Sequence, residues 1–174
     1  MKPRLVVIAL LCVVATHGDV KTKTYTDPEG CFRTYHVATG RVLTSRGLVE
    51  DPTVNAIVKE AVAAQMNTLQ ITQAEKDPDL EVRFMGGNGA GLQTDASPAV
   101  GDVAMWDIGG PQAVGGKTYK KSTLVIGVVD KRSNQTVWTA TCTDKFGDPS
   151  KMRERIDKAV EKAFSKFPKK FACR

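Results

Sequence analysis

Residues 122–130 constrain the fold more than any other segment of this sequence. They are Ser-Thr-Leu-Val-Ile-Gly-Val-Val-Asp, apolar on both faces, as expected for a strand at the centre of a sheet. A turn sequence follows at 131–134, and residues 136–143 return with Trp138, Ala140 and Cys142 at alternate positions. The sequence therefore predicts a central β-hairpin.

Two segments have the spacing of amphipathic helices. In the first, Asp51 is a good N-cap and Pro52 a good first residue, and apolar residues recur every three or four positions over 54–69. In the second, Asp148 and Pro149 play the same roles ahead of a similar apolar stripe. Each helix is predicted to bury one face.

Three further segments, 20–26, 32–37 and 80–84, have the alternation or the β-branched and aromatic content of strands. Residues 86–116 hold nine of the fifteen glycines and show no periodicity, which predicts a glycine-rich loop. The fold class expected is α+β: a two-layer sandwich in which a mixed sheet of four to five strands carries both amphipathic helices on one face. Residues 19–174 are expected to form this single domain.

The N-terminus has the layout of a secretory signal peptide. Lys2 and Arg4 precede the apolar run 5–15, and small residues permit cleavage after Ala15 or Gly18, so we expect residues 1–18 to be removed. The run is shorter than the roughly 20 residues that span a bilayer, and we expect no transmembrane helix in the mature chain.

A lipid anchor is not expected at Cys12, because Leu11 stands where a small residue is required and Cys12 lies inside the apolar run. These features predict a periplasmic or secreted protein. Export leaves Cys31, Cys142 and Cys173 in an oxidising compartment, where thiols tend to pair. The last helix would carry Cys173 away from Cys142, so a Cys31–Cys173 disulfide is our hypothesis.

The net charge of +6 is concentrated near the C-terminus. Residues 151–174 hold nine basic and three acidic side chains, which equals the excess of the whole chain. Lys158, Lys162 and Lys166 recur at four-residue spacing and would lie on one side of a helix. This predicts either a solvated helix face or a contact surface for anionic lipid or cell-wall polymer.

Carboxylates near Asp79 and Asp130 are the candidates for acid–base catalysis. Asp77 and Asp79 flank a turn, Glu81 lies on the more polar side of a strand and Asp130 ends another strand. Such residues also suit turn hydrogen bonds, and their spacing lacks a calcium-loop pattern. A structural role is the simpler interpretation.

Other catalytic or cofactor sites are not indicated. His36 has no metal-ligand spacing around it, and on one strand Cys31 and His36 would point to opposite faces, which excludes a nucleophile–base pair. The glycines at 86–91 lack the spacing of a dinucleotide fingerprint. No cofactor and no metal are expected.

Several short motifs occur in a characteristic order. They are Arg33-Thr34-Tyr35, Pro78-Asp79-Leu80-x-Val82, Leu124-Val125-Ile126-x-Val128-Val129-Asp130, Val137-Trp138 and Phe167-Pro168. In this the sequence resembles a bacterial family of envelope proteins, a domain-of-unknown-function family whose members are mostly exported lipoproteins. The resemblance implies an envelope location and this fold, with no assigned reaction.

The sequence departs from the pattern of that family at three places. Gly127 replaces an acidic residue, Thr139 replaces a basic residue after the tryptophan, and the lipidation cysteine is missing or misplaced. The first two changes weaken any site that such charges would build. The third favours a form that is not anchored by lipid.

The function expected is that of a non-catalytic exported envelope domain that binds a protein, a lipid or a cell-wall component. The alternative is a hydrolase-type enzyme that uses the carboxylates near Asp79 and Asp130. Nucleic-acid binding is disfavoured by export and by the scarcity of aromatic residues among the basic ones.

Overall fold

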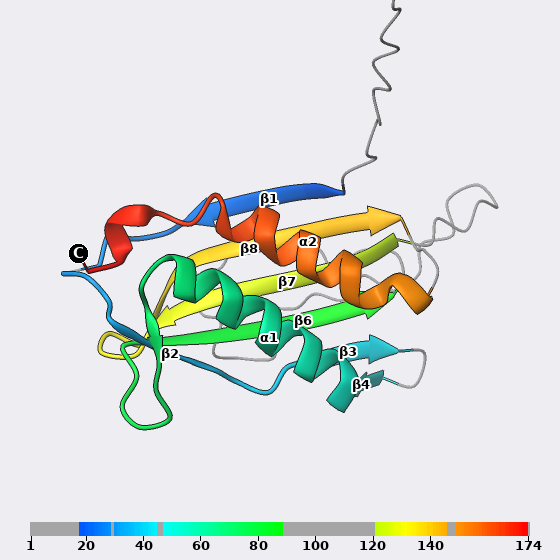
Figure 1. The fold of residues 1–174 in the computed structure, drawn as a ribbon, viewed down its shortest axis with the longest axis horizontal. Coiled ribbons are helices and arrows are strands. Elements are labelled where there is room, and N and C mark those ends of the chain that lie inside the picture. Colours follow the sequence, from blue (N-terminus) through cyan, green and yellow to red (C-terminus); the bar gives the residue numbers. More distant parts are fainter. Residues whose placement is uncertain (1–17, 29, 45–46, 89–120, 146–148, 174) are drawn as a thin grey trace, which may run out of the picture.

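A computed structural model describes residues 18–28, 30–44, 47–88, 121–145 and 149–173, and it shows two helices packed on one large mixed sheet (Figure 1). The elements, in chain order, are β1 (Asp19–Thr24), β2 (Thr34–Val37), β3 (Arg41–Thr44), β4 (Gly47–Val49), α1 (Pro52–Thr68), β5 (Thr72–Gln73), β6 (Leu80–Asn88), β7 (Lys121–Asp130), β8 (Gln135–Lys145), the 3₁₀ turn η2 (Pro149–Lys151), α2 (Met152–Phe164) and the 3₁₀ turn η3 (Lys169–Phe171).

The α+β class is confirmed, but the sheet is larger than the predicted four to five strands. The described residues form an eight-stranded sheet in the order β1-β8-β7-β6-β2-β5, with β3 also paired to β6 and β4 to β3. The three strands that the prediction lacked, β3, β4 and β5, have four, three and two residues. Segments this short are too brief for alternation to be recognised in a sequence.

The central hairpin is confirmed. Strands β7 and β8 pair antiparallel from Lys121–Lys145 to Asp130–Gln135, with a bulge that shifts the register between Val128 and Val129. Strand β6 pairs antiparallel with β7 on its other side, whereas β2 and β3 pair parallel to β6. The apolar segment 122–130 therefore lies at the middle of the sheet, as its composition requires.

The first two strands lie on opposite sides of this centre. Strand β1 pairs with β8 at one edge, while β2 pairs with β5 and β6 beyond the hairpin. Residues 25–28 and 30–33 thus cross the end of the sheet. There Phe32 forms a bridge with Ala172, and Cys31 is bonded to Cys173, so the C-terminal segment lies beside the crossing chain.

Both helices cover the same face of the sheet (Figure 1). Helix α1 begins as predicted: Pro52 is its first residue, and the Asp51 side chain accepts hydrogen bonds from the amides of Thr53 and Val54. Apolar residues of both helices pack on the alternate residues of β6, β7 and β8 that face them, among them Leu80, Ile126 and Trp138.

Helix α2 begins three residues later than predicted. Pro149 opens the 3₁₀ turn η2 rather than the helix itself, and Asp148 lies outside the described residues. A series of aromatic rings in mutual contact continues from α2 towards the C-terminus. Trp138 contacts Phe164 and Phe167. Phe167 in turn contacts Phe171, which packs on Phe32. These rings fill the space under the crossing segment.

Two predicted segments lie mostly outside the description. Gly86 and Gly87 belong to β6, so the predicted glycine-rich loop cannot begin at residue 86, and its positions 89–116 are outside the described residues. The predicted signal peptide is likewise outside, except for Gly18. No helix within the described part of the chain has the length and apolar character needed to cross a membrane.

Candidate functional site

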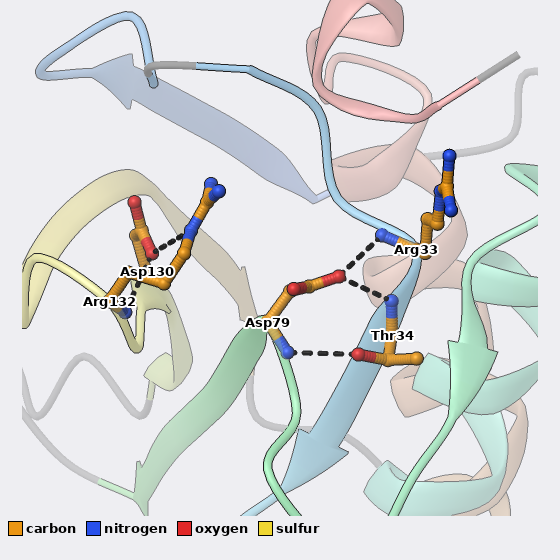
Figure 2. Close-up of polar contacts among 5 residues, drawn as sticks. All are labelled: Arg33, Thr34, Asp79, Asp130 and Arg132. Carbon is orange, nitrogen blue, oxygen red and sulfur yellow. Dashed lines mark hydrogen bonds and ion pairs between the residues drawn. The ribbon is translucent and has the colours of Figure 1, made fainter.

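Asp79 joins the start of β6 to the start of β2. Its Oδ2 accepts hydrogen bonds from the backbone N–H of Arg33 at 2.7 Å and of Thr34 at 3.1 Å, and its own N–H donates to the hydroxyl of Thr34 at 2.9 Å (Figure 2). The Asp79 carbonyl accepts a further bond from the Lys131 amide. One residue therefore connects β2, β6 and the turn between β7 and β8.

These contacts determine the charge state of Asp79. Burial by itself raises the pKa of the carboxyl, but the backbone amides of Arg33 and Thr34, the Thr34 hydroxyl and the nearby Arg132 guanidinium outweigh it. The pKa therefore lies below its ordinary value. A carboxylate held ionised by backbone donors is a poor general acid near neutral pH.

Asp130 is the neighbour of Asp79 across the sheet, because it lies opposite Leu80 in the pairing of β6 and β7. Its carboxylate is buried and points to its own turn: Oδ1 accepts from the Arg132 amide at 2.9 Å and lies 3.5 Å from the Arg132 Nε. Figure 2 shows the Asp79 carboxylate directed towards Arg33 and Thr34, and the Asp130 carboxylate directed towards Arg132. The two carboxylates therefore point to different partners.

A second polar group lies on the sheet face away from the helices. Glu81 accepts hydrogen bonds from Arg83 and from Lys131, the latter at 3.0 Å. Burial alone would raise the pKa of Glu81, but these two cations lower it below the ordinary value. His36 is opposite Glu81 in the sheet, and its Nδ1 lies 3.5 Å from Glu75. We call the side chains of His36, Glu75, Glu81, Arg83 and Lys131 the polar face.

The structure gives His36 one acidic neighbour rather than a ligand set. It is half-buried on β2, with its Nδ1 3.5 Å from the Glu75 carboxylate. In the part of the chain that the structure describes, no three His, Cys, Asp or Glu side chains lie close enough to hold a metal ion together.

Gly127 and Thr139, the two expected departures from a family pattern, lie opposite each other. Gly127 of β7 pairs with Thr139 of β8, and the row continues to Arg83 on one side and Lys23 on the other. An acidic and a basic residue at these positions would form a cross-strand ion pair. In this chain the middle of the row carries no charge.

The three lysines of the predicted anionic contact do not form a common free surface. Lys162 donates to the carbonyl of Gly18 and Lys166 to that of Val20, each at 2.6 Å, while Lys158 pairs with Glu154 on the exposed side of α2. Their four-residue spacing predicted a shared direction, but two of the three donate to backbone carbonyls, one in strand β1 and one just before it.

The structure brings Cys31 and Cys173 together in a disulfide, with the Cα atoms 4.9 Å apart. Cys142, the free cysteine of the described residues, is buried, and its thiol lies 3.5 Å from the Ala159 carbonyl. Burial raises the pKa of Cys142 to about 12, although Lys162 and Lys166 oppose the shift. A buried thiol with a raised pKa carries little of the thiolate that acts as nucleophile or metal ligand.

One polar residue that organises the fold was absent from the sequence prediction. Asn55 is buried in the first turn of α1 and hydrogen-bonds both backbone groups of Gly40. Its position within the predicted helix, on the side that carries Val58 and Val62, is the signal that could have identified it, because a buried amide requires partners.

Residues 21–169 match the family described as a domain of unknown function, DUF4136. Curated proteins gave no match.

Solved structures share the fold at low sequence identity. A DUF4136 family protein from Bacteroides thetaiotaomicron has 17% identity and a TM-score of 0.59, covering 91% of this chain and 99% of that one. A PelC dodecamer from Paraburkholderia phytofirmans has 11% identity and a TM-score of 0.51, and the match covers 90% of this chain and 99% of that one. A PDZ domain protein from Parabacteroides distasonis has 13% identity and a TM-score of 0.56, and the match covers 86% of this chain but 35% of that one.

The family match spans most of the chain, from β1 to the last 3₁₀ turn, and the predicted resemblance to a family of unknown function is confirmed at that level. The chain belongs to the DUF4136 family.

Proposed function

We propose that this chain is a non-catalytic domain, exported to the cell envelope, that binds another protein. The observation that carries the proposal is that both candidate catalytic carboxylates hydrogen-bond to the backbone of the domain itself. Asp79 holds the backbone of β2, and Asp130 holds the turn between β7 and β8. Both act within the fold.

The disulfide supports the exported location. Structural disulfides persist in oxidising compartments and are rare in reducing ones. The Cys31–Cys173 bond ties the C-terminal segment to the chain that crosses the sheet, at the position where Phe32 and Phe171 pack. The signal-peptide layout of residues 1–18 supports the same location.

The distribution of charge favours a protein as the partner. An anionic lipid or polymer requires a surface of one sign, but Lys162 and Lys166 donate to β1 and Lys158 is paired. The polar face instead mixes both signs, with Lys131 39% exposed and Glu75 75% exposed. A mixed-charge surface suits recognition of a protein with complementary charges.

No described contact favours the hydrolase alternative. A hydrolase that uses two carboxylates needs one that holds a proton near neutral pH. The pKa of Asp79 is lowered rather than raised, and the Asp130 carboxylate is directed to Arg132.

Export is tested by fractionating cells that produce the full chain and measuring the mass of the recovered protein. We expect a leader-free chain in the periplasm or the medium, two daltons lighter than its reduced form. Full-length chain confined to the cytoplasm would contradict the proposal.

Binding is tested with a photo-reactive amino acid placed on either face. At Glu75, on the polar face, it should yield a cross-linked protein of defined mass in envelope extracts. At Glu60, which is 63% exposed on α1, it should not. Equal products at both positions, none at Glu75, or sedimentation with phosphatidylglycerol vesicles would overturn a protein partner at this face.

A further inference from the structure

Strand β1 is the last strand on its side of the described sheet. The amide of Tyr25 donates to the Val137 carbonyl at 3.0 Å, in continuation of the register that pairs Thr24 with Trp138. Because hydrogen-bonding direction alternates along an antiparallel strand, the odd residues of β1 face β8 and the even residues direct their N–H and C=O outward. Such a row is a template for a further strand.

Lysines of α2 occupy two outward carbonyls, that of Val20 in β1 and that of Gly18, which directly precedes the strand. Lys162 donates to Gly18 and Lys166 to Val20. Four residues of a helix rise about 6 Å, and two residues of a strand span about 6.6 Å. The spacing of the lysines therefore matches the spacing of successive outward carbonyls, and each ammonium reaches one acceptor.

We propose that Lys162 and Lys166 close this edge of the sheet against strand β1 of a second copy of the chain. In one antiparallel register, the amides of Thr22 and Thr24 of an incoming copy would donate to Val20 and Gly18. Those are the acceptors that the lysines occupy.

The same register explains why a second copy fits the edge. It places Asp19 of each copy opposite Lys23 of the other, on the face away from the helices, so two ion pairs form across the symmetry axis. Lys21 would face its own counterpart and oppose the contact. The edge is complementary to itself in charge, and the lysines of α2 keep it from pairing.

The test replaces both ammonium groups by apolar ends of similar length, Lys162→Met together with Lys166→Met. Sedimentation equilibrium over a concentration series should give the monomer mass for the wild-type chain and a rise towards the dimer mass for the variant. The matched control, Lys158→Met with Lys169→Met, loses the same charge away from β1 and should remain monomeric.

Two further substitutions, each made in the double lysine variant, test whether the outer edge of β1 is the surface that associates. Thr22→Pro removes an outward N–H without touching the β1–β8 ladder and should restore the monomer; Thr24→Pro is the substitute if that chain does not fold. Asp19→Lys should weaken association by removing both ion pairs. A lysine variant that stays monomeric, or a dimer that survives either proline, would overturn the proposal.

Discussion

The side-chain amide of Asn55 is hydrogen-bonded to both backbone polar groups of Gly40. Its Oδ1 accepts from the Gly40 N–H at 2.7 Å, and its Nδ2 donates to the Gly40 carbonyl at 3.1 Å and to the Asp51 carbonyl at 2.9 Å. Asn55 is 7% exposed, so no bulk water replaces these bonds. The first turn of α1 is thereby fixed to the connection between β2 and β3.

Asn55→Ala should therefore lower the free energy of unfolding by about 3 kcal/mol, since it leaves buried backbone groups without partners. Urea denaturation followed by circular dichroism measures this loss. Asn67→Ala, on the exposed side of the same helix, is the control and should change stability little. A loss no greater than that of the control would show that Gly40 finds other partners.

Phe84 leaves no room for a side chain at position 40. A Cβ at this position would overlap the Phe84 ring, and the ring itself lies in the core. Gly40→Ala should destabilise the chain by about 2 kcal/mol, as overpacking does. The double variant Gly40→Ala, Phe84→Leu should cost less than the sum of the two single changes, because the smaller side chain makes room. Additive costs in thermal denaturation would argue against the contact.

Asp79 makes stability depend on pH. Since the folded-state pKa of Asp79 is below its unfolded value, its contribution is present above about pH 4 and is lost as the pH falls through the folded-state pKa. Asp79→Asn should lose about 2 kcal/mol at pH 7, the difference between charged and neutral acceptors, and the gap to wild type should narrow in acid. Denaturant titrations from pH 7 to pH 3 test this, with Asp77→Asn as the control. A gap independent of pH would exclude the carboxylate contacts.

The Cys31–Cys173 disulfide closes a long loop, with a sequence separation of 142. Replacing both cysteines by alanine should lower stability by about 4 kcal/mol, and a reductant should lower wild type, but not the variant, by a similar amount. Differential scanning calorimetry with and without reductant compares them. Equal melting of both oxidised proteins would show that the bond adds nothing to the fold.

Cys142 should be chemically silent in the folded chain. Burial raises its pKa to about 12, so the reactive thiolate is scarce at pH 8. Iodoacetamide should leave the peptide that contains Cys142 unmodified under native conditions and alkylate it fully in denaturant, as peptide mass spectrometry would show. Rapid native labelling at pH 8 would mean that the strand opens locally.

Local sequence patterns predict the long elements of this chain well. Asp51 and Pro52 define the start of α1, and the apolar segment 122–130 identifies the sheet centre, because capping and burial depend on near neighbours. The position of β1 at the far edge is different: pairing with β8 joins residues more than a hundred positions apart, and no local pattern encodes it.

The candidate sites show the same division. The sequence indicated that Asp79 would accept hydrogen bonds near a turn. Its partners, Arg33 and Thr34, could not be identified, because they lie far away in the sequence. The spacing of Lys162 and Lys166 predicted that they share one side of a helix. What that side meets was not predictable, because the carbonyls of Gly18 and Val20 are supplied by the opposite end of the chain.

The disulfide also decides how the domain would carry a mechanical load. Residues 31–173 form a covalent loop, so tension applied between β1 and the C-terminus passes through the Cys31–Cys173 bond and bypasses the helices and most of the sheet. Residues 19–31 then span at most about 40 Å at full stretch, and part of that length is already extended in β1. A domain tethered at both ends would therefore yield at the β1–β8 ladder and at the contacts of Lys162 and Lys166 with Gly18 and Val20, and keep its remaining core intact.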